Sequence, residues 1–447
     1  MTNPTLVLVL PSLRLYKSLC QSELVQELRN KFELKITISE NELGALSPDF
    51  DEVYAYQESN FLMRIHKLAL DVETFRNKDL NVSYETRIRM ITNLPQPKEI
   101  SIKSFVSLNS SYGVILSVLG SRIGYLMFGS IVRLLGSVHP GLTQILNSTS
   151  PDIIVCFSGG FYSGVENFLG RYARSNKVPF ILIIDNWDNL SSKSVIWNKP
   201  TLMGVWGPEM ATDAIELQGM DSSKVIEIGS SRLDLESPSE APRWLAQSKP
   251  YVLFAGTGIQ HLDELQALIE TRLALNNLGC RELPIIYRPH PWNLRGDFRQ
   301  KLSKILSTPG IILDQDIAEN GPDSFYNRES LYHLENLVRN CSFLVAGHST
   351  VIVEALYYGK KVLALTGSTH FLFNTTDSWI IYRHMSRLRG NPGITECNRI
   401  SEICKALKVL LHSTVSDQNL VPHILPNFES SYQARVTQLI NNLLNER

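Results

Sequence analysis

The sequence of 447 residues lacks an excess of either charge, because 43 Lys and Arg stand against 44 Asp and Glu. This balance provides no overall field for a polyanion, and no basic stripe is present, so nucleic acid is not expected as a partner. Charged residues make up only 19% of the chain. Low charge together with ordinary aromatic content argues against disorder. The length is sufficient for two or three domains, each with its own core.

Several catalytic and metal-binding patterns are missing. The six cysteines include no C-x-x-C pair, which predicts reduced thiols. The ten histidines form no H-x-x-x-H or H-E-x-x-H pattern, so no metal site is expected. Neither a Walker A sequence nor G-x-S-x-G occurs. Two D-x-D triplets are present, Asp49–Asp51 and Asp314–Asp316. Both are interpreted as solvated turns.

The chain also lacks a membrane or export segment near its start. The first apolar run ends at Pro11 and no basic region precedes it, so neither a signal peptide nor a span is predicted there. Tyr112–Gly136 is largely apolar, but Arg122 lies near its middle, and a charge at mid-membrane is costly. Two interpretations stay open, namely core helices of a globular domain or a membrane-surface patch. We predict a cytoplasmic protein, with peripheral association at the inner face of the membrane as the alternative.

What the sequence does contain is a repeated order of short apolar runs and helical stretches. Continuous apolar runs separated by helices predict an α/β fold with parallel sheets covered on both faces. The predicted strands are Thr5–Leu10, Leu34–Ile38, Asp152–Phe157, Phe180–Ile184, Leu202–Trp206, Val225–Ile228, Tyr251–Ala255, Pro284–Tyr287, Ile311–Leu313, Phe343–Ala346 and Lys361–Leu365. The predicted helices are Asn60–Phe75, Ser163–Asn176, Asp263–Leu278, Ser330–Asn340, Thr350–Tyr358 and Gln433–Asn445.

A change in composition divides the chain. Glu236–Arg243 contains two prolines and two serines and is typical of a surface linker. We therefore predict two α/β domains, over residues 1–240 and 241–427, followed by a C-terminal helix over 428–447 that returns to the first domain. A cleft between the two domains is the expected position of a ligand.

The strongest candidate ligand site follows the strand 343–346. That strand leads through Gly347 and His348 into Ser349 and Thr350, and then directly into a helix. First-turn amides and hydroxyls of this kind form an anion pocket. Glu354 lies one turn further on the same side, where a carboxylate can accept ribose hydroxyls. The alternative is ordinary capping by Ser349 with a solvated Glu354.

Two further strand ends in the second half carry suitable residues. The strand 284–287 is followed by Arg288 and by His290, which stands between two prolines. An imidazole held in this way can donate to a phosphate oxygen or protonate it, whereas the alternative is a structural histidine. The loop Gly256-Thr257-Gly258 follows the strand 251–255, and its glycines permit close approach of a phosphate.

The first half offers polar residues after two strands. Ser158 and Gly159 follow one strand, and Asp185, Trp187 and Asp188 follow the next. A carboxylate at this edge can act as a general base on a hydroxyl, and the Trp187 ring offers a face for a sugar. Alternatively, Asp185 and Asp188 cap the following turn.

Two α/β halves with phosphate-binding motifs in the second half resemble the GT-B glycosyltransferases, whose two Rossmann-like parallel-sheet domains face a cleft. The run YRPHP, followed later by HSTVIVEALYYGKKVLAL, is similar to the HP and Ser-Thr motifs of capsule-polysaccharide Kdo transferases, bacterial sialyltransferases and CDP-glycerol transferases. In those families the motifs hold the donor phosphate, and they match His290, Ser349 and Thr350. The family acid that contacts the ribose matches Glu354.

The first half also resembles the non-hydrolysing UDP-N-acetylglucosamine 2-epimerases, in which an acid after the second of two adjacent strands matches Asp185. The His-Arg-Arg-Glu-Asn run of those enzymes is absent, and only His261 lies near that point. The Asp/Glu-Asp/Glu-Gly motif of the sialyltransferases is absent as well.

Together these resemblances imply a metal-independent glycosyltransferase of cell-surface glycan synthesis that needs no cofactor and takes a CMP-, CDP- or UDP-linked sugar as substrate. The acceptor, a glycan or a lipid-linked sugar, would bind domain 1–240 and be activated by Asp185 or Asp188. The alternatives are a sugar-nucleotide epimerase and a GT-B-like subunit that binds nucleotide or glycan without turnover. The donor would contact Gly256, Thr257, Gly258, Arg288, His290, Ser349, Thr350 and Glu354, and the acceptor Ser158, Gly159 and Trp187.

Overall fold

The computed structural model of the protein divides into two compact units. Unit 1 contains residues 1–95, 100–231 and 423–447, and unit 2 contains residues 96–99 and 232–422. The residues that the structure describes are 3–12, 15–16, 19, 23–40, 53–57, 61, 64–65, 68–69, 72–73, 110–135, 139–158, 164–233, 250–257, 261–290, 294, 302–303, 305–321, 328–366, 383–415 and 418–446.

Unit 1 is built on a seven-stranded sheet in which every paired strand is parallel to its neighbour. The strand order is β3-β2-β1-β4-β5-β6-β7. The central strands are almost entirely apolar and buried, because helices cover both of their faces. The strands are β1 Thr5–Leu10, β2 Glu33–Ser39, β3 Val53–Tyr56, β4 Ile153–Ser158, β5 Phe180–Ile184, β6 Leu202–Val205 and β7 Val225–Glu227.

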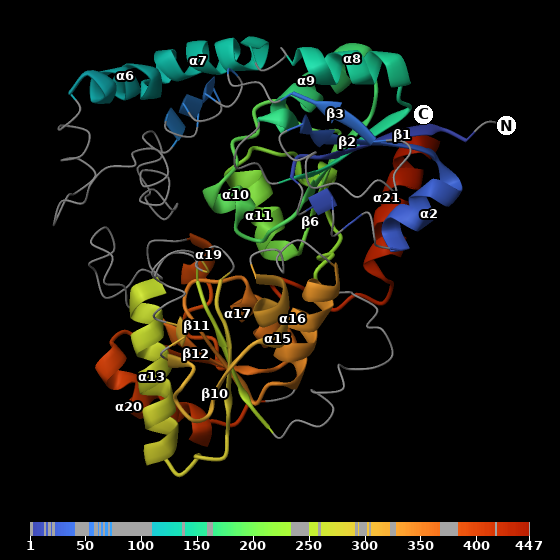
Figure 1. Ribbon diagram of the computed structural model, residues 1–447. Coiled ribbons are helices and arrows are strands. Elements are labelled where there is room, and N and C mark those ends of the chain that lie inside the picture. Colours follow the sequence, from blue (N-terminus) through green and yellow to red (C-terminus); the bar gives the residue numbers. More distant parts are fainter. Residues whose placement is uncertain are drawn as a thin grey trace. The chain divides into compact units, whose positions relative to one another are not determined.

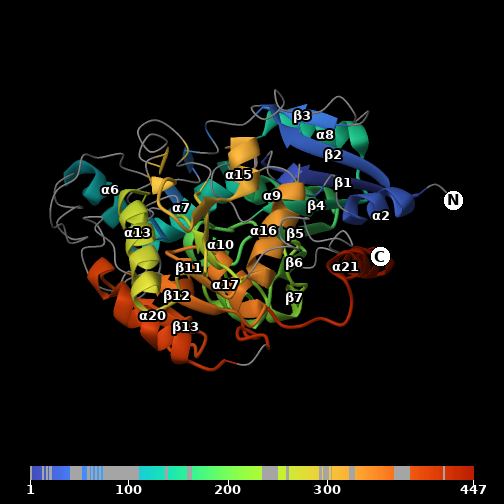
Figure 2. The ribbon, with the colours of Figure 1, turned by 60° about the horizontal axis from the view of Figure 1, so that its bottom comes forward.

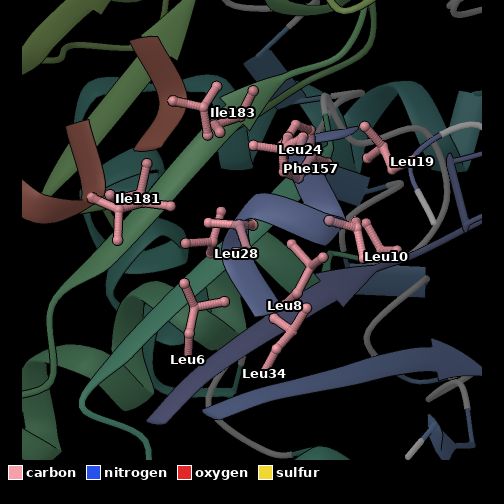
Figure 3. Close-up of a cluster of buried hydrophobic side chains, with 14 of the residues drawn as sticks. Leu6, Leu8, Leu10, Leu19, Leu24, Leu28, Leu34, Phe157, Ile181 and Ile183 are labelled. Atoms are coloured by element: carbon pink, nitrogen blue, oxygen red, sulfur yellow. The ribbon is translucent and has the colours of Figure 1, made fainter. Parts of the chain in front are cut away.

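One face of this sheet packs against α2 (Glu23–Lys31) and α21 (Tyr432–Asn445). Leu6, Leu8 and Leu10 of β1 point to this side and contact Leu24 and Leu28 of α2 (Figure 3). The C-terminal helix α21 lies beside α2 in Figure 1 and contributes Val436, Ile440 and Leu443 to the same core. The last helix of the chain therefore belongs to unit 1.

The opposite face of the unit 1 sheet is covered by α8 (Pro140–Thr149) and α9 (Val165–Asn176). Lys177 ends α9 in the left-handed conformation, which lets the chain turn back into β5. Other helices in the described part of unit 1 are α6 Ser110–Gly120, α7 Arg122–Leu135, α10 Asn189–Ser192 and α11 Pro208–Glu216.

Unit 2 is built on a six-stranded parallel sheet with the order β10-β9-β8-β11-β12-β13. α13 and α20 lie side by side next to this sheet, and α16 and α17 form a second neighbouring pair (Figures 1 and 2). The strands are β8 Val252–Ala255, β9 Ile285–Arg288, β10 Ile311–Leu313, β11 Phe343–Ala346, β12 Lys361–Leu365 and β13 Ile394–Cys397. The helices are α13 His261–Asn277, α15 Gln315–Asn320, α16 Arg328–Asn340, α17 Val351–Tyr357, α19 Arg383–Ser386 and α20 Ile403–His412.

The predicted α/β class and parallel sheets are confirmed, and each predicted strand is present within a residue or two of its expected bounds. Two strands, β3 and β13, were not predicted. Both lie at the end of a sheet, where one side has no neighbouring strand and a short, partly polar sequence is tolerated. The predicted linker 236–243 lies outside the described residues.

The apolar segment Tyr112–Gly136 folds into α6 and α7, of which residues 110–135 are described. The prediction of core helices holds only for one side, since Leu116, Phe128 and Val132 are buried while most other large apolar side chains are exposed. Within the described part of the chain, no single helix is long and apolar enough to span a membrane. The pair Val114–Gly120 and Arg122–Leu134 satisfies the length and composition together but bends by 88°.

Candidate functional site

Three predicted ligand loops of unit 2 meet at one edge of its sheet. β8 lies between β9 and β11, and Ala255, its last residue, pairs with both Arg288 and Ala346. Gly256, His290 and His348 therefore follow three adjacent strands at the same carboxyl edge. In open parallel sheets this edge is where ligands bind. Residues far apart in the sequence are brought together by the strand order.

The backbone amides of the first loop, at Gly256 and Thr257, donate hydrogen bonds to neighbouring parts of unit 2. The backbone N–H of Gly256 donates to the carbonyl of Arg288 at 2.8 Å. The N–H of Thr257 donates to a carboxylate oxygen of Glu264 at 2.6 Å. A Cβ at position 256 would lie 2.2 Å from Glu264 Oε1 and 2.9 Å from the backbone nitrogen of His290, so only glycine fits here. The phosphate contact predicted for this loop then depends on Gly258, which lies outside the described residues.

Glu264 was not predicted, although it is central to this edge. Its carboxyl accepts hydrogen bonds from Thr257 and from the hydroxyl of Tyr287, and only 5% of the residue is exposed. Burial raises the pKa of Glu264 from 4.5 to about 7, although the two hydrogen bonds oppose the rise. A carboxyl that titrates near neutrality therefore supports the first loop.

Arg288 does not face solvent but belongs to a buried ionic cluster. Its guanidinium pairs with Asp314 and with Asp316, the latter at 3.0 Å. His333 bonds the second oxygen of Asp314, and Ser330 donates to Asp316 at 2.7 Å. Burial by itself raises the pKa of Asp314, but the His333 hydrogen bond and the Arg288 charge lower it below 3.8.

This cluster corrects the interpretation of Asp314–Asp316 as a solvated turn. Asp314 is 1% exposed and directly follows β10, which places it beside the end of β9. The interpretation was wrong because a paired arginine makes burial of both carboxylates possible. The other triplet, Asp49–Asp51, lies outside the described residues. Among the residues that the structure describes, no group of three or more His, Cys, Asp or Glu side chains could hold a metal ion.

His290 lies at the end of β9 and is partly exposed. Burial lowers its pKa from 6.5 to about 4, and the Arg288 charge contributes to the lowering. The imidazole is therefore neutral at pH 7, with one ring nitrogen as donor and the other as acceptor. A bound phosphate anion would favour the protonated form.

The other His-Pro pair shows what a purely structural histidine looks like in this protein. His139 is 1% exposed, and its Nδ1 accepts from the Leu142 N–H at 3.3 Å to cap α8. Its ring packs between Tyr56 and Phe168. His139 thus has a complete internal role, and it precedes a helix instead of ending a strand.

The Ser-Thr motif lies at the start of α17. The Ser349 hydroxyl accepts weakly from the Val351 N–H at 3.4 Å, while Thr350 occupies the cap position, one residue later than predicted. Glu354 is only 4% exposed and lies 3.7 Å from the Nε of Arg232. The alternative of a solvated Glu354 therefore does not describe this side chain, which is a buried carboxylate with a cationic neighbour.

In unit 1 the predicted residues lie at the carboxyl edge of β4 and β5. Ser158, the last residue of β4, pairs with Ile184, and its carbonyl accepts from the Asp185 N–H at 3.3 Å. The Ser158 hydroxyl donates to Oε1 of Glu166 in the first turn of α9. Glu166 is 2% exposed, and its Oε2 has no hydrogen-bond partner among the described residues. Glu166 was not predicted, and Gly159 lies outside the described residues.

Asp185 and Asp188 are both partly exposed, whereas Trp187 between them is buried. The Asp188 carboxylate forms an ion pair with Lys193 at 2.8 Å and caps no helix amide. Trp187 is 3% exposed, so the protein itself covers its ring. A sugar would reach that ring only if neighbouring groups moved, and the predicted stacking on Trp187 stays a prediction.

One of the missed residues, Asp314, has a recognisable signal in the sequence. Asp314 directly follows a predicted strand, as Asp185 does, and the same rule applied evenly would have selected it. Glu264 and Glu166 instead lie in the first turn or two of helices that follow strand-end loops. An acid at such a place is often only a favourable helix-dipole residue, so burial of these two carboxyl groups could not be predicted from their positions.

Comparison with solved structures places this architecture in a known fold. S. aureus MnaA, solved with UDP, is similar over 99% of this chain and 97% of its own at 12% identity, with a TM-score of 0.51. The calicheamicin glycosyltransferase CalG4 is similar over 100% and 99% of the two chains at 12% identity, with a TM-score of 0.53. The UDP-GlcNAc 2-epimerase of Methanocaldococcus jannaschii is similar over 98% and 99% at 11% identity, with a TM-score of 0.50.

At these identities the similarity defines the fold, which is GT-B: two parallel-sheet α/β domains of seven and six strands. The predicted fold class is confirmed. No protein-family model matches the sequence. No curated protein matches it either. The solved structures of this fold include both epimerases and glycosyltransferases.

Proposed function

We propose that the protein is a sugar-nucleotide enzyme, and specifically a metal-independent glycosyltransferase that uses a nucleotide-activated sugar. The observation that carries this proposal is the convergence of the loops after β8, β9 and β11 at one edge of the unit 2 sheet. These loops contribute a neutral histidine, two hydroxyl residues and a segment whose sequence contains two glycines. Such groups suit a diphosphate or monophosphate better than an apolar ligand.

In this proposal His290, Ser349, Thr350 and Gly258 contact the donor phosphate. The neutral His290 donates an N–H to a phosphate oxygen. Bound phosphate raises the pKa of His290, so the ring can take up a proton from solvent when the donor binds, and it can pass that proton to the departing phosphate as negative charge develops there. Fixed donors of this kind stabilise a leaving group by electrostatics, without a metal.

Two buried acids of unit 2 have separate roles in the proposal. Arg288 and Asp314 fix the end of β9 and thus the loop that carries His290, so Arg288 acts as a positioning residue instead of a direct phosphate ligand. Glu354 would accept hydroxyls of the ribose. Because Glu354 is buried beside Arg232, the ribose would have to approach its carboxylate from the side on which Arg232 lies.

The acceptor hydroxyl would be activated on unit 1 by Asp185. Asp188 is the second candidate, but its carboxylate is already paired with Lys193. Glu166 holds the Ser158 hydroxyl next to Asp185 and has one carboxylate oxygen without a partner among the described residues. We propose that Glu166 and Ser158 orient the acceptor while Asp185 removes the proton.

The finer assignment rests on the sequence resemblance. The HP and Ser-Thr motifs favour the group of capsule-polysaccharide Kdo transferases, sialyltransferases and CDP-glycerol transferases, and therefore a role in cell-surface glycan synthesis. The donor would be CMP-, CDP- or UDP-linked and the acceptor a glycan or lipid-linked sugar, handled on the cytoplasmic side.

Sugar-nucleotide epimerisation is the second candidate function. It is supported by the fold shared with UDP-GlcNAc 2-epimerases and by the position of Asp185. It is opposed by the absence of the His-Arg-Arg-Glu-Asn run. An epimerase would interconvert UDP-N-acetylglucosamine and its C2 epimer with no acceptor present, which proton NMR of the sugar detects.

The first experiment is a thermal-shift and calorimetric screen against CMP, CDP, UDP, GDP and their sugars. We expect one nucleotide class to stabilise the protein, and His290→Ala combined with Ser349→Ala to abolish that stabilisation. His412→Ala is the matched control, because His412 is exposed on α20, where its Nδ1 bonds the Lys408 carbonyl. Absence of a shift with every nucleotide would contradict the donor site. Nucleotide binding without transfer, epimerisation or donor hydrolysis would identify a binding subunit.

A further inference from the structure

The two helices α6 and α7 carry an unusual concentration of exposed apolar side chains. Eight of the thirteen exposed large hydrophobic residues in the described part of unit 1 and unit 2 lie on these helices. Each is between 48% and 72% exposed. We call this set the outer face: Val114, Ile115, Val118, Ile123, Leu126, Met127, Ile131 and Leu134. Patches of this kind mark interaction surfaces.

The opposite side of the same helices is fixed to unit 1. Phe128 and Val132 are buried with Val72 and Trp197, and the rings of Tyr125 and Phe128 pack edge-on against Trp197. The Tyr125 hydroxyl also donates to Glu73, which in turn accepts from the Trp197 indole at 3.3 Å. Because α7 already packs on unit 1 through its opposite side, the outer face is a second, separate surface of this helix.

The bend between the helices is specified by local sequence. The Ser121 hydroxyl donates to the Val118 carbonyl at 2.7 Å and accepts from the Gly124 N–H at 3.1 Å. A Cβ at Gly124 would lie 1.9 Å from the Val118 carbonyl oxygen, so the bend requires glycine there. The 88° bend makes α6 and α7 two short helices of 11 and 14 residues. At about 1.5 Å per residue, neither reaches across a hydrocarbon core of ~30 Å.

Charge borders the outer face on one side. Arg122 and Arg133 are both exposed. They are three helical turns apart and so lie along the same flank of α7, next to Leu126. Between Glu99 and Asp152 the sequence contains no acidic residue. An apolar helix face that is bordered by arginines, in a segment whose own sequence has no acidic residue, matches an anionic lipid surface. The apolar side chains would enter the headgroup region and the guanidinium groups would contact phosphates.

We propose that the outer face of α6 and α7 docks the protein on an anionic lipid bilayer, with both helices lying in the plane of the interface. A second copy of the chain fits less well. A symmetric contact through the same face would bring two pairs of arginines together with no carboxylate from this segment to offset them. The inference does not depend on the proposed function, since lipid binding needs neither donor nor turnover.

The test is flotation of the purified full chain with vesicles of phosphatidylcholine alone and with added phosphatidylglycerol. We expect the protein to float with the anionic vesicles. Leu126→Gln with Met127→Gln should weaken this binding at least about tenfold, because two apolar side chains no longer leave water. Arg122→Gln with Arg133→Gln should weaken binding to anionic vesicles only, and added salt should have the same effect. The matched control is Leu273→Gln with Val409→Gln, two exposed apolar residues on α13 and α20.

Two results would overturn the proposal. If the wild-type chain stays unbound with both kinds of vesicle, the outer face does not bind lipid. If light scattering shows a dimer that the Leu126→Gln, Met127→Gln variant dissociates, a second copy occupies the face. Circular dichroism and the unfolding temperature of each variant, compared with the control pair, distinguish loss of binding from loss of folding.

Discussion

The carboxylate of Glu264 accepts the backbone N–H of Thr257 at 2.6 Å, and this single bond links helix α13 to the loop at the proposed phosphate site. The same carboxyl accepts the Tyr287 hydroxyl from β9. One buried acid thus joins the loop after β8 to the strand that carries His290. Because burial raises its pKa to about 7, this link changes charge in the physiological range.

The stability of unit 2 should therefore depend on pH through Glu264. Its pKa is about 7 in the folded protein against 4.5 for the free side chain, so the folded state binds more protons between these values. The contribution of Glu264 is complete below pH 4.5 and is lost as the pH rises through 7, by up to ~3 kcal/mol. Glu264→Gln should remove this loss. Urea unfolding between pH 5 and 8 measures it.

Comparing the wild type with Glu264→Gln separates the pH effect of Glu264 from that of the histidines. His139 and His290, whose pKa values are lowered to about 4, act in the opposite direction between pH 4 and 6.5, but they are present in both proteins. Glu270→Gln, on the same helix α13, serves as the control and should follow the wild-type pH dependence. Parallel curves for wild type and Glu264→Gln would show that Glu264 is not the group responsible.

Gly256→Ala should damage the donor site more than the fold. The new Cβ would lie 2.2 Å from Glu264 Oε1 and 2.9 Å from the backbone nitrogen of His290, so Glu264 or the His290 loop must move. We expect a loss of ~1–3 kcal/mol in stability and at least tenfold weaker nucleotide binding. Gly129→Ala is the control, because no atom lies within 4 Å of its Cβ position in α7. Unchanged calorimetric affinity in Gly256→Ala would contradict the role of this loop.

Removing the charge of Asp314 should strongly destabilise unit 2. Asp314→Asn leaves the buried Arg288 with Asp316 alone and changes the bond from His333. Breaking one partner of a buried ion pair costs ~3–5 kcal/mol. Glu319→Gln on the neighbouring α15 is the control and should stay within ~0.5 kcal/mol of wild type, since Glu319 is exposed. Denaturant midpoints measured at pH 7 compare the two, and equal midpoints would mean that the cluster is not structural.

Steady-state kinetics in a transfer assay should distinguish the roles of the three acidic residues of unit 1. Asp185→Asn should lower kcat by ~10²–10⁴-fold, because a general base is lost. Glu166→Gln should mainly raise KM, since Glu166 holds Ser158 and acts on the reaction through acceptor position. Asp188→Asn should have the smallest effect, because that carboxylate is paired with Lys193. A fall in kcat for Glu166→Gln as large as for Asp185→Asn would transfer the role of base to Glu166.

The sequence by itself determined the local elements and the places where ligand groups could occur. Runs such as Thr5–Leu10 and Phe343–Ala346 are continuous and apolar, and a run of that kind is stable only as a strand buried on both faces. Polar residues stand within three positions of the ends of several such runs. The positions of Asp185, His290 and Ser349 near strand ends could therefore be predicted without knowledge of which strands are neighbours.

Only the tertiary structure decided which of these residues meet and what each one already contacts. The strand order places β8 between β9 and β11, and so joins the Gly256 loop to His290. Packing within unit 2 also buries Arg288 against Asp314 and brings the Thr257 amide to Glu264, whereas packing within unit 1 leaves one side of α7 exposed. Each of these depends on packing between segments distant in the sequence. The apolar sequence of α7 is the same whether a protein core or a lipid surface covers it. Only the burial of Phe128 and Val132 in the core shows which side of the helix is exposed.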